Sequence, residues 1–233
     1  MKVASGKKTI KIARSAAAVC IALLTFAGGA FFLLLNSHYL YSLAAATATP
    51  QNSRAAVDSE TAALISADVI LYIRGGSNMK YASSFSSEEL SHLADVRHKV
   101  GLFQASFYFL VAAMAVAFLA ILAIDKDLGK FVVILGQALF ASGAISVAIS
   151  AILFLLSSVN FDASFTVFHK ILFSSSQWQF PSYYLLVNLF TADFFASFAR
   201  AVVVAGFVGG LVLILVSLVM GKFYNPKAAS ISA

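Results

Sequence analysis

Four stretches of the chain are apolar over a length that suffices to cross a lipid bilayer. They span about residues 15–35, 102–124, 131–159 and 199–220. About 20 helical residues cover a hydrocarbon core of about 30 Å, so each stretch is typical of a transmembrane helix. Hydrophobic residues make up 61% of the 233 residues, above the roughly 45–50% of a soluble domain. We therefore predict an all-α fold, a four-helix transmembrane bundle that forms a single integral membrane domain over residues 1–233.

Small residues recur in the third and fourth stretches. They include Gly136, Gly143, Gly206, Gly209 and Gly210. Because glycine lets two helix backbones approach closely, we expect these two helices to make close contacts with their neighbours.

Basic residues gather at one end of the predicted helices. Nine of the 16 Lys and Arg residues lie there: Lys2, Lys7, Lys8, Lys11, Arg14, Lys126, Lys130, Lys222 and Lys227. The positive-inside rule places such an end in the cytoplasm. We therefore predict that both termini are cytoplasmic and that two segments, about residues 36–101 and 160–198, lie outside.

A basic N-terminal stretch followed by an apolar run is also typical of a cleavable signal. The stretch SAAAVC offers Cys20 as a lipidated residue, and residues 44–46 offer a second cleavage site. The apolar run continues beyond Cys20 to Leu35, whereas the apolar region of a signal precedes its cleavage site. We therefore favour a membrane anchor.

Short amphipathic helices are predicted within the first outer segment. In DSETAALISADVILY, apolar residues recur with the 3.6-residue period of a helix that Asp58 caps and that lies against the membrane surface. Arg74-Gly75-Gly76 then ends this helix. Ser86 or Ser87 caps a further helix that leads directly into the second membrane span.

This further helix opens with SEELSHLADVRHK, an unusual density of titratable groups in a chain with 11% charged residues. Spacings of three and four residues place Glu88 or Glu89, His92, Asp95 and Lys99 on one helix face. One interpretation is a solvated turn whose Arg97 and Lys99 reach lipid headgroups. The other is an imidazole that a neighbouring carboxylate orients as a base.

The second outer segment offers a possible counterpart. Asp162 and His169 are seven residues apart, which is two turns of a helix, with Phe161, Phe165 and Phe168 interleaved. The many Phe side chains and Trp178 form either an aromatic belt at the membrane interface or a surface for acyl chains.

Several function classes find little support in the sequence. The net charge of +6 lacks the basic patch with aromatic platforms that nucleic-acid binding requires, so we expect no nucleic-acid partner. A single cysteine excludes a disulfide framework and a Cys-based metal site. We expect no cofactor and no metal, although a zinc hydrolase using His92 and His169 and a non-catalytic four-span scaffold stay open as alternatives. The sequence predicts no oligomeric state.

Two spaced motifs resemble a known family. They are E-L-x-H-x-x-D-V-R before the second span, and F-D-x-x-F-x-x-F-H-x-x-x-F with a downstream Trp and a terminal F-F before the fourth. Together with the stretch Y-I-R-G-G and the four-span layout, they resemble the bacterial lipoprotein intramolecular transacylases, called Lit.

The resemblance implies an acyltransferase of the bacterial plasma membrane that acts at the outer leaflet. Its partners would be a diacylglyceryl lipoprotein substrate and membrane lipid. The enzyme would move the sn-2 acyl chain from glycerol to the free α-amino group of the lipoprotein's N-terminal cysteine. Because nucleophile and ester belong to one molecule, no enzyme nucleophile is required, which agrees with the absence of a G-x-S-x-G motif.

The resemblance also suggests roles for individual residues. His169 would be the general base and His92 a second polar centre, although the two roles are interchangeable at this stage. We expect both histidines to line one cavity. Supporting residues would be Asp162, which orients His169, with Glu89 and Asp95 beside His92, and Arg97, which binds the carbonyl, the oxyanion or a phospholipid phosphate. Acyl chains would contact Phe165, Phe168 and Trp178.

Overall fold

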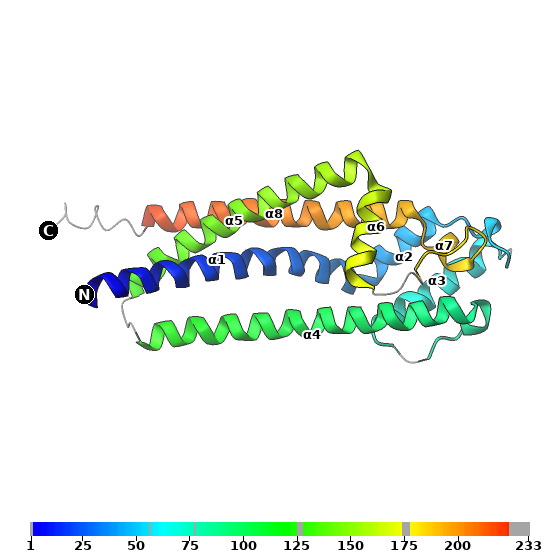
Figure 1. Ribbon diagram of the computed structural model, residues 1–233, viewed down its shortest axis with the longest axis horizontal. Helices are drawn as coiled ribbons and strands as arrows, with labels where there is room; N and C mark the ends of the chain where they lie inside the picture. Colours follow the sequence, from blue (N-terminus) through cyan, green and yellow to red (C-terminus); the bar gives the residue numbers. More distant parts are fainter. Residues whose placement is uncertain (1, 56, 77, 125–127, 174–177, 224–233) are drawn as a thin grey trace. The chain divides into compact units, whose positions relative to one another are not determined.

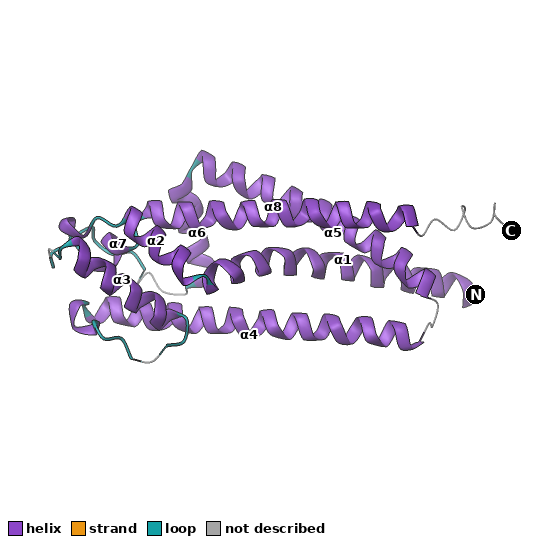
Figure 2. Ribbon diagram, turned by 180° about the vertical axis from the view of Figure 1, so that it is seen from behind, coloured by secondary structure: helices purple, strands orange, loops and turns teal. Residues whose placement is uncertain are grey.

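The computed structural model describes residues 2–55, 57–76, 78–124, 128–173 and 178–223. These residues form helices and loops without strands, which confirms the all-α prediction (Figures 1 and 2). The helices are α1 (Lys2–Leu35), α2 (Ser37–Thr47), α3 (Ser59–Ile73), α4 (Ser87–Ile124), α5 (Leu128–Val159), α6 (Phe161–Leu172), α7 (Leu185–Leu189) and α8 (Ala192–Phe223). Short 3-10 helices cover Pro50–Asn52 and Ala82–Ser84.

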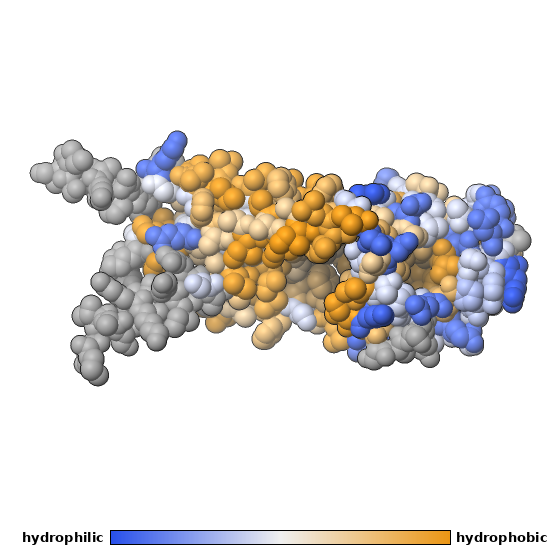
Figure 3. Space-filling view, turned by 45° about the horizontal axis from the view of Figure 1, so that its top comes forward, coloured by the Kyte–Doolittle hydropathy of each residue, from blue (hydrophilic) through white to orange (hydrophobic). Residues whose placement is uncertain are grey.

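Four of these helices are long and apolar enough to cross a membrane. The candidate spans are Ala17–Leu35, Ser87–Val116, Phe131–Val159 and Ala192–Lys222, in α1, α4, α5 and α8. Much of their exposed surface is hydrophobic (Figure 3), as lipid contact requires. The four predicted spans are thus confirmed. The cytoplasmic location of both termini stays a prediction, and Lys126 and Lys227 lie outside the described residues.

Packing divides the chain into two compact units, which we describe separately. The first contains residues 1–29, 107–152 and 203–233, and the second contains residues 30–106 and 153–202. The prediction of a single domain stays a prediction.

Glycine contacts hold the helices of the first unit close together. A Cβ atom on Gly143 of α5 would lie 2.5 Å from the carbonyl oxygen of Gly210 in α8. On α8, a Cβ atom on Gly206 would lie 2.6 Å from the ring of Phe26, and one on Gly209 would lie 2.7 Å from Thr25. The close helix contacts that the sequence predicts at these glycines are therefore present.

Serine hydroxyls add hydrogen bonds between the same helices. Ser142 Oγ of α5 lies 2.9 Å from the carbonyl oxygen of Ala18 in α1, and Ser217 Oγ of α8 lies 2.7 Å from that of Gly136 in α5. Both serines are buried. Such hydrogen bonds contribute to helix association where water is absent.

We expect Gly143→Ala to lower the unfolding temperature of the protein in detergent. The added methyl group has no room against Gly210, and overpacking of this kind costs about 1–3 kcal/mol. Gly101→Ala in α4 is the matched control, because a Cβ atom there meets no heavy atom within 4 Å. Equal unfolding temperatures for the two variants would contradict the close contact.

The second unit builds its core around α3. Asp58 caps α3 by accepting a hydrogen bond from the Thr61 backbone N–H at 2.8 Å, as the sequence predicts. The location of this helix at the membrane surface stays a prediction. Its apolar stripe is buried within the protein, in one core cluster that also includes residues of α4 and α7: Ala62, Ile65, Val69, Phe85, Leu93, Leu185, Leu186 and Leu189. The 3.6-residue period identifies the apolar face of a helix but not what covers it.

The end of α3 is tied to the junction between α1 and α2. Arg74, the C-cap of α3, donates to the carbonyl oxygen of Leu35 at 2.9 Å and to the hydroxyl of Ser37. Its guanidinium thereby satisfies a carbonyl group that the end of α1 leaves without a helical partner. Gly75 follows with a φ of 100°, a left-handed conformation that glycine adopts readily.

Candidate active site

The first turn of α4 is fixed by a capping box. The backbone N–H of Ser86 donates to Glu89 Oε2 at 2.8 Å, and the backbone N–H of Glu89 lies 3.3 Å from Ser86 Oγ. This reciprocal pair satisfies two backbone donors that a helix start leaves free. The sequence predicts Ser86 or Ser87 as the cap, and the structure selects Ser86.

Glu89 also joins α4 to α7. Its second carboxylate oxygen, Oε1, accepts a hydrogen bond of 2.8 Å from the backbone N–H of Leu186 in the first turn of α7. The side chain is only 3% exposed. The carboxylate that the sequence places beside His92 is thus occupied by two backbone donors. Its role in the structure is to position α4, one turn before His92.

His92 is half-buried among aromatic rings. Its ring centroid lies 5.2 Å from that of Phe173 and 5.4 Å from that of Phe180. Asp95, one turn along α4, is exposed and interacts electrostatically with the imidazole. The polar helix face that the sequence predicts therefore joins His92 to Asp95 rather than to Glu89.

His169 is buried more deeply, with 7% of its surface exposed. It lies in α6. The predicted pairing with Asp162 requires this segment to be helical, and it is. Four aromatic rings surround the imidazole, with centroid distances of 4.0 Å to Phe165, 5.4 Å to Phe168, 5.6 Å to Phe173 and 4.8 Å to Trp178. Three of these rings, Phe165, Phe168 and Trp178, are those for which the resemblance implies contact with acyl chains.

A backbone carbonyl fixes the tautomer of His169. Nδ1 lies 2.9 Å from the carbonyl oxygen of Phe165. A carbonyl oxygen only accepts hydrogen bonds, so Nδ1 carries the proton in the neutral ring and Nε2 retains its lone pair. Burial lowers the pKa of His169 below its ordinary value, and the hydrogen bond to Phe165 acts in the opposite direction. The arrangement yields a neutral imidazole with one defined basic nitrogen.

The structure brings the two histidines to the same aromatic ring. Phe173 lies 5.2 Å from His92 and 5.6 Å from His169, measured between centroids. The two imidazoles also interact electrostatically. No role was assigned to Phe173 or Phe180 from the sequence. Phe173 follows His169 by four residues, one helical turn, and this spacing could have indicated that it lies beside the imidazole.

The remaining charged residues lie apart from this pair. The Arg97 guanidinium lies 4.6 Å from the ring centroid of Tyr72 in α3. Asp162 is exposed in the first turn of α6, and within the described residues it makes no hydrogen bond or ion pair with His169. Seven residues of helix rise about 10 Å, so two side chains on one face at this spacing do not touch. The carbonyl of Phe165 occupies the orienting position predicted for Asp162.

This geometry predicts that Asp162→Asn does not alter the acid limb of the pH profile, which is the fall in the rate of acyl transfer as the pH decreases. A general base must be neutral, and burial lowers the pKa of His169, so this limb should lie below about pH 6.5, the ordinary value for histidine. Removing an exposed, unpaired carboxylate should not move it further. The test measures the rate of acyl transfer by the wild type and by the variant across a range of pH. A shift of the limb to lower pH in Asp162→Asn would show that this carboxylate does stabilise the imidazolium.

A zinc site at His92 and His169 is the alternative that the sequence leaves open. Within the described parts of the chain, no three His, Cys, Asp or Glu side chains come close enough together to hold a metal ion.

Comparison with known proteins relates this site to one family. The family profile described as "Lipoprotein intramolecular transacylase Lit" matches residues 15–195. A solved structure of the membrane-integral lipoprotein intramolecular transacylase Lit from Bacillus cereus is similar, with a TM-score of 0.74 at 18% identity, covering 94% of this chain and 99% of that one. A second structure of the Bacillus cereus protein, with one histidine replaced by arginine, gives 0.69 at 17%, covering 97% and 98%. These two likenesses concern the fold.

A curated relative is also similar in sequence. An uncharacterised protein of Aquifex aeolicus is 23% identical over 146 residues, which is 63% of this chain. The match spans 62% of the length of that protein.

Proposed function

The chain belongs to the lipoprotein intramolecular transacylase family, and from this premise we propose its reaction. The protein moves the sn-2 acyl chain of an S-diacylglyceryl-cysteine lipoprotein to that lipoprotein's own N-terminal α-amino group. The product is an N-acyl, lyso-form lipoprotein. The observation that carries the assignment to particular residues is the meeting of His92 and His169 at Phe173.

His169 acts as the general base in this proposal. Its Nε2 takes a proton from the substrate α-ammonium, and the neutral amine attacks the sn-2 ester carbonyl. Nε2 passes this first proton to water and then takes a second proton from the nitrogen of the tetrahedral intermediate. The intermediate collapses with loss of the glycerol oxygen, which receives the second proton from Nε2. An amide bond forms, an ester bond breaks, and one proton of the ammonium is released to water. The hydrogen bond from Nδ1 to Phe165 supports this assignment, because it keeps the basic nitrogen in one position.

His92 is the second polar centre. Its half-buried ring contacts Phe173, and from there it holds the headgroup or donates to the oxyanion. Glu89 positions the helix that carries it, and Asp95 supplies a negative charge one turn further along. Arg97, held over Tyr72, binds either the substrate carbonyl or a lipid phosphate.

Lipid reaches this site along α6. Val167, Phe168 and Ile171 are 57%, 55% and 78% exposed on this helix, which begins two residues after the end of a membrane span at Val159. Phe168 also contacts His169, so an acyl chain on this surface lies next to the proposed base. Phe165 and Trp178 complete the apolar surroundings. Together with the basic residues at the other end of the spans, this surface supports a site at the outer leaflet of the plasma membrane.

Substrate and product are isomers and have the same mass, so the test must use fragmentation in a mass spectrometer to establish which atom carries the acyl chain. Purified protein in liposomes is mixed with a synthetic diacylglyceryl lipopeptide, and fragment ions reveal whether the α-amine is acylated. We expect N-acylation with loss of one glycerol ester, and no reaction with an N-acetylated lipopeptide. Release of free fatty acid without N-acylation would instead indicate a hydrolase, and an unchanged lipopeptide would contradict the proposal.

A further inference from the structure

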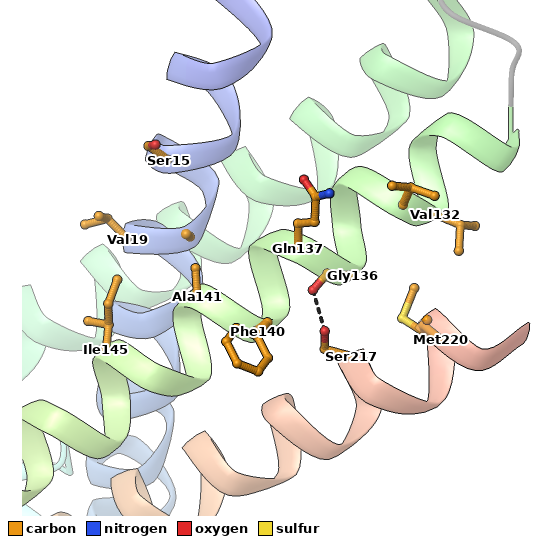
Figure 4. Close-up of a pocket in the computed structure, with 13 residues that line it drawn as sticks. Ser15, Val19, Val132, Gly136, Gln137, Phe140, Ala141, Ile145, Ser217 and Met220 are labelled. Carbon is orange, nitrogen blue, oxygen red and sulfur yellow. Dashed lines mark hydrogen bonds between the residues drawn. The ribbon is translucent and has the colours of Figure 1, made fainter. Parts of the chain in front are cut away.

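A cavity of about 670 Å³ lies in the first packing unit (Figure 4). Three helices line it: α1, α5 and α8. Most of its wall is apolar and includes Val19, Val132, Phe140, Ile145 and Met220. The hydroxyl of Ser217 also lies in the wall and donates to the carbonyl of Gly136 (Figure 4). We call this cavity the basal groove.

The basal groove opens at one end of the membrane spans and runs into them. Ser15, Val132 and Gly221 line it, and each lies within two residues of a span boundary. Along α5 the lining extends from Val132 to Ile145, about 20 Å of helix. One leaflet occupies about half of the 30 Å hydrocarbon core. The groove is therefore at least as long as the hydrocarbon part of one leaflet.

Helix packing does not explain the glycine at the centre of the groove. A Cβ atom on Gly143 would meet backbone at 2.5 Å, whereas one on Gly136 would meet its nearest heavy atom, Met220 Cβ, at 4.0 Å. Gly136 thus leaves a space where its side chain would lie, although α5 and α8 do meet at its carbonyl oxygen, which accepts from Ser217. An apolar space that faces hydrocarbon fills with lipid, because empty space forfeits dispersion contacts.

In the sequence, a basic residue stands within two positions of a lining residue on each of the three helices. Arg14 precedes Ser15 in α1, Lys130 stands two residues before Val132 in α5, and Lys222 follows Gly221 in α8. The Lys222 side chain is exposed. Asp125 and Asp127, which are near Lys130 in the sequence, lie outside the described residues. Basic pockets between transmembrane helices suit anionic lipid headgroups.

We propose that the basal groove binds an anionic glycerophospholipid, with one acyl chain along α5 and the phosphate at the end lined by Ser15, Val132 and Gly221, beside Lys222. This lipid is distinct from the substrate of the acyl transfer, because none of the lining residues is among those proposed for the transfer. Binding would link α1, α5 and α8 at the end of the spans that carries most of the basic residues.

Native mass spectrometry and thermal unfolding of the full chain in detergent test the proposal. Phosphatidylglycerol is compared with phosphatidylcholine of the same acyl chains, and inorganic phosphate serves as a further ligand. We expect phosphatidylglycerol to remain bound and to raise the unfolding temperature, with phosphatidylcholine retained at least about tenfold less. Equal retention of the two lipids, or an equal shift from inorganic phosphate, would overturn the proposal.

Two pairs of variants locate the site. Gly136→Leu fills the groove and should reduce retention of phosphatidylglycerol at least about tenfold, whereas Gly101→Leu, in open space on α4, should not. Lys222→Gln should reduce the preference for the anionic lipid, whereas Lys80→Gln, also exposed, should preserve it. Ala141→Leu fills the same groove and serves if Gly136→Leu does not fold. Wild-type retention in a folded groove-filling variant would overturn the proposal.

Discussion

Substituting His169 with glutamine is expected to lower the rate of acyl transfer by about 10²–10⁴-fold, the usual contribution of a general base. Glutamine retains polar atoms of similar reach but has no basic nitrogen. The imidazole has one basic atom, Nε2, since Nδ1 donates to the carbonyl of Phe165. The rate is measured from N-acylated fragment ions of the lipopeptide, and circular dichroism establishes that the variant is folded.

Two exposed histidines provide matched controls for this experiment. His38→Gln and His98→Gln make the same chemical change outside the aromatic cluster, and both should retain the wild-type rate. His92→Gln separates the roles of the two site histidines. The substrate amine titrates at about pH 8 in every variant. If His169 is the base, His92→Gln keeps the further fall in rate below about pH 6.5, and His169→Gln loses it. The reverse pattern would exchange the roles, and a wild-type rate in folded His169→Gln would remove His169 from the chemistry.

The membrane architecture was predictable because its cause is local. A span requires about 20 consecutive apolar residues, and such runs are visible without knowledge of any neighbour. The capping box at Ser86 and Glu89 is likewise written within four residues. The sequence therefore identified the helix that carries His92, its start and its continuation into the second span.

Contacts between segments far apart in the sequence could not be predicted from the spacing of residues. Periodicity found the apolar face of α3, but the residues of α4 and α7 that bury it lie far away in the chain. Asp162 and His169 share a helix face, yet sharing a face two turns apart does not bring side chains into contact. The ring orientation of His169 depends on a backbone carbonyl, which every residue possesses and no motif reveals.

Glu89 is the clearest case of a role that depends on such a distant contact. Its Oε1 accepts from Leu186, which is 97 positions further along the chain. A pattern search within one helix pairs Glu89 with His92 instead, because the two are three residues apart. These two roles predict different results for the same substitution.

Glu89→Gln is expected to reduce the free energy of unfolding by about 1–3 kcal/mol, the cost of leaving a buried backbone donor without an acceptor. Each carboxylate oxygen accepts one backbone N–H at 2.8 Å, so an amide nitrogen in place of either oxygen faces a donor. The side chain is 3% exposed, so little water is available to replace the lost bond. Glu88→Gln, one residue earlier and exposed, should unfold at the wild-type temperature in the same detergent. If Glu89 instead orients His92, folded Glu89→Gln would keep wild-type stability and show a displaced pH profile, and its assignment as a cap of α4 and α7 would be wrong.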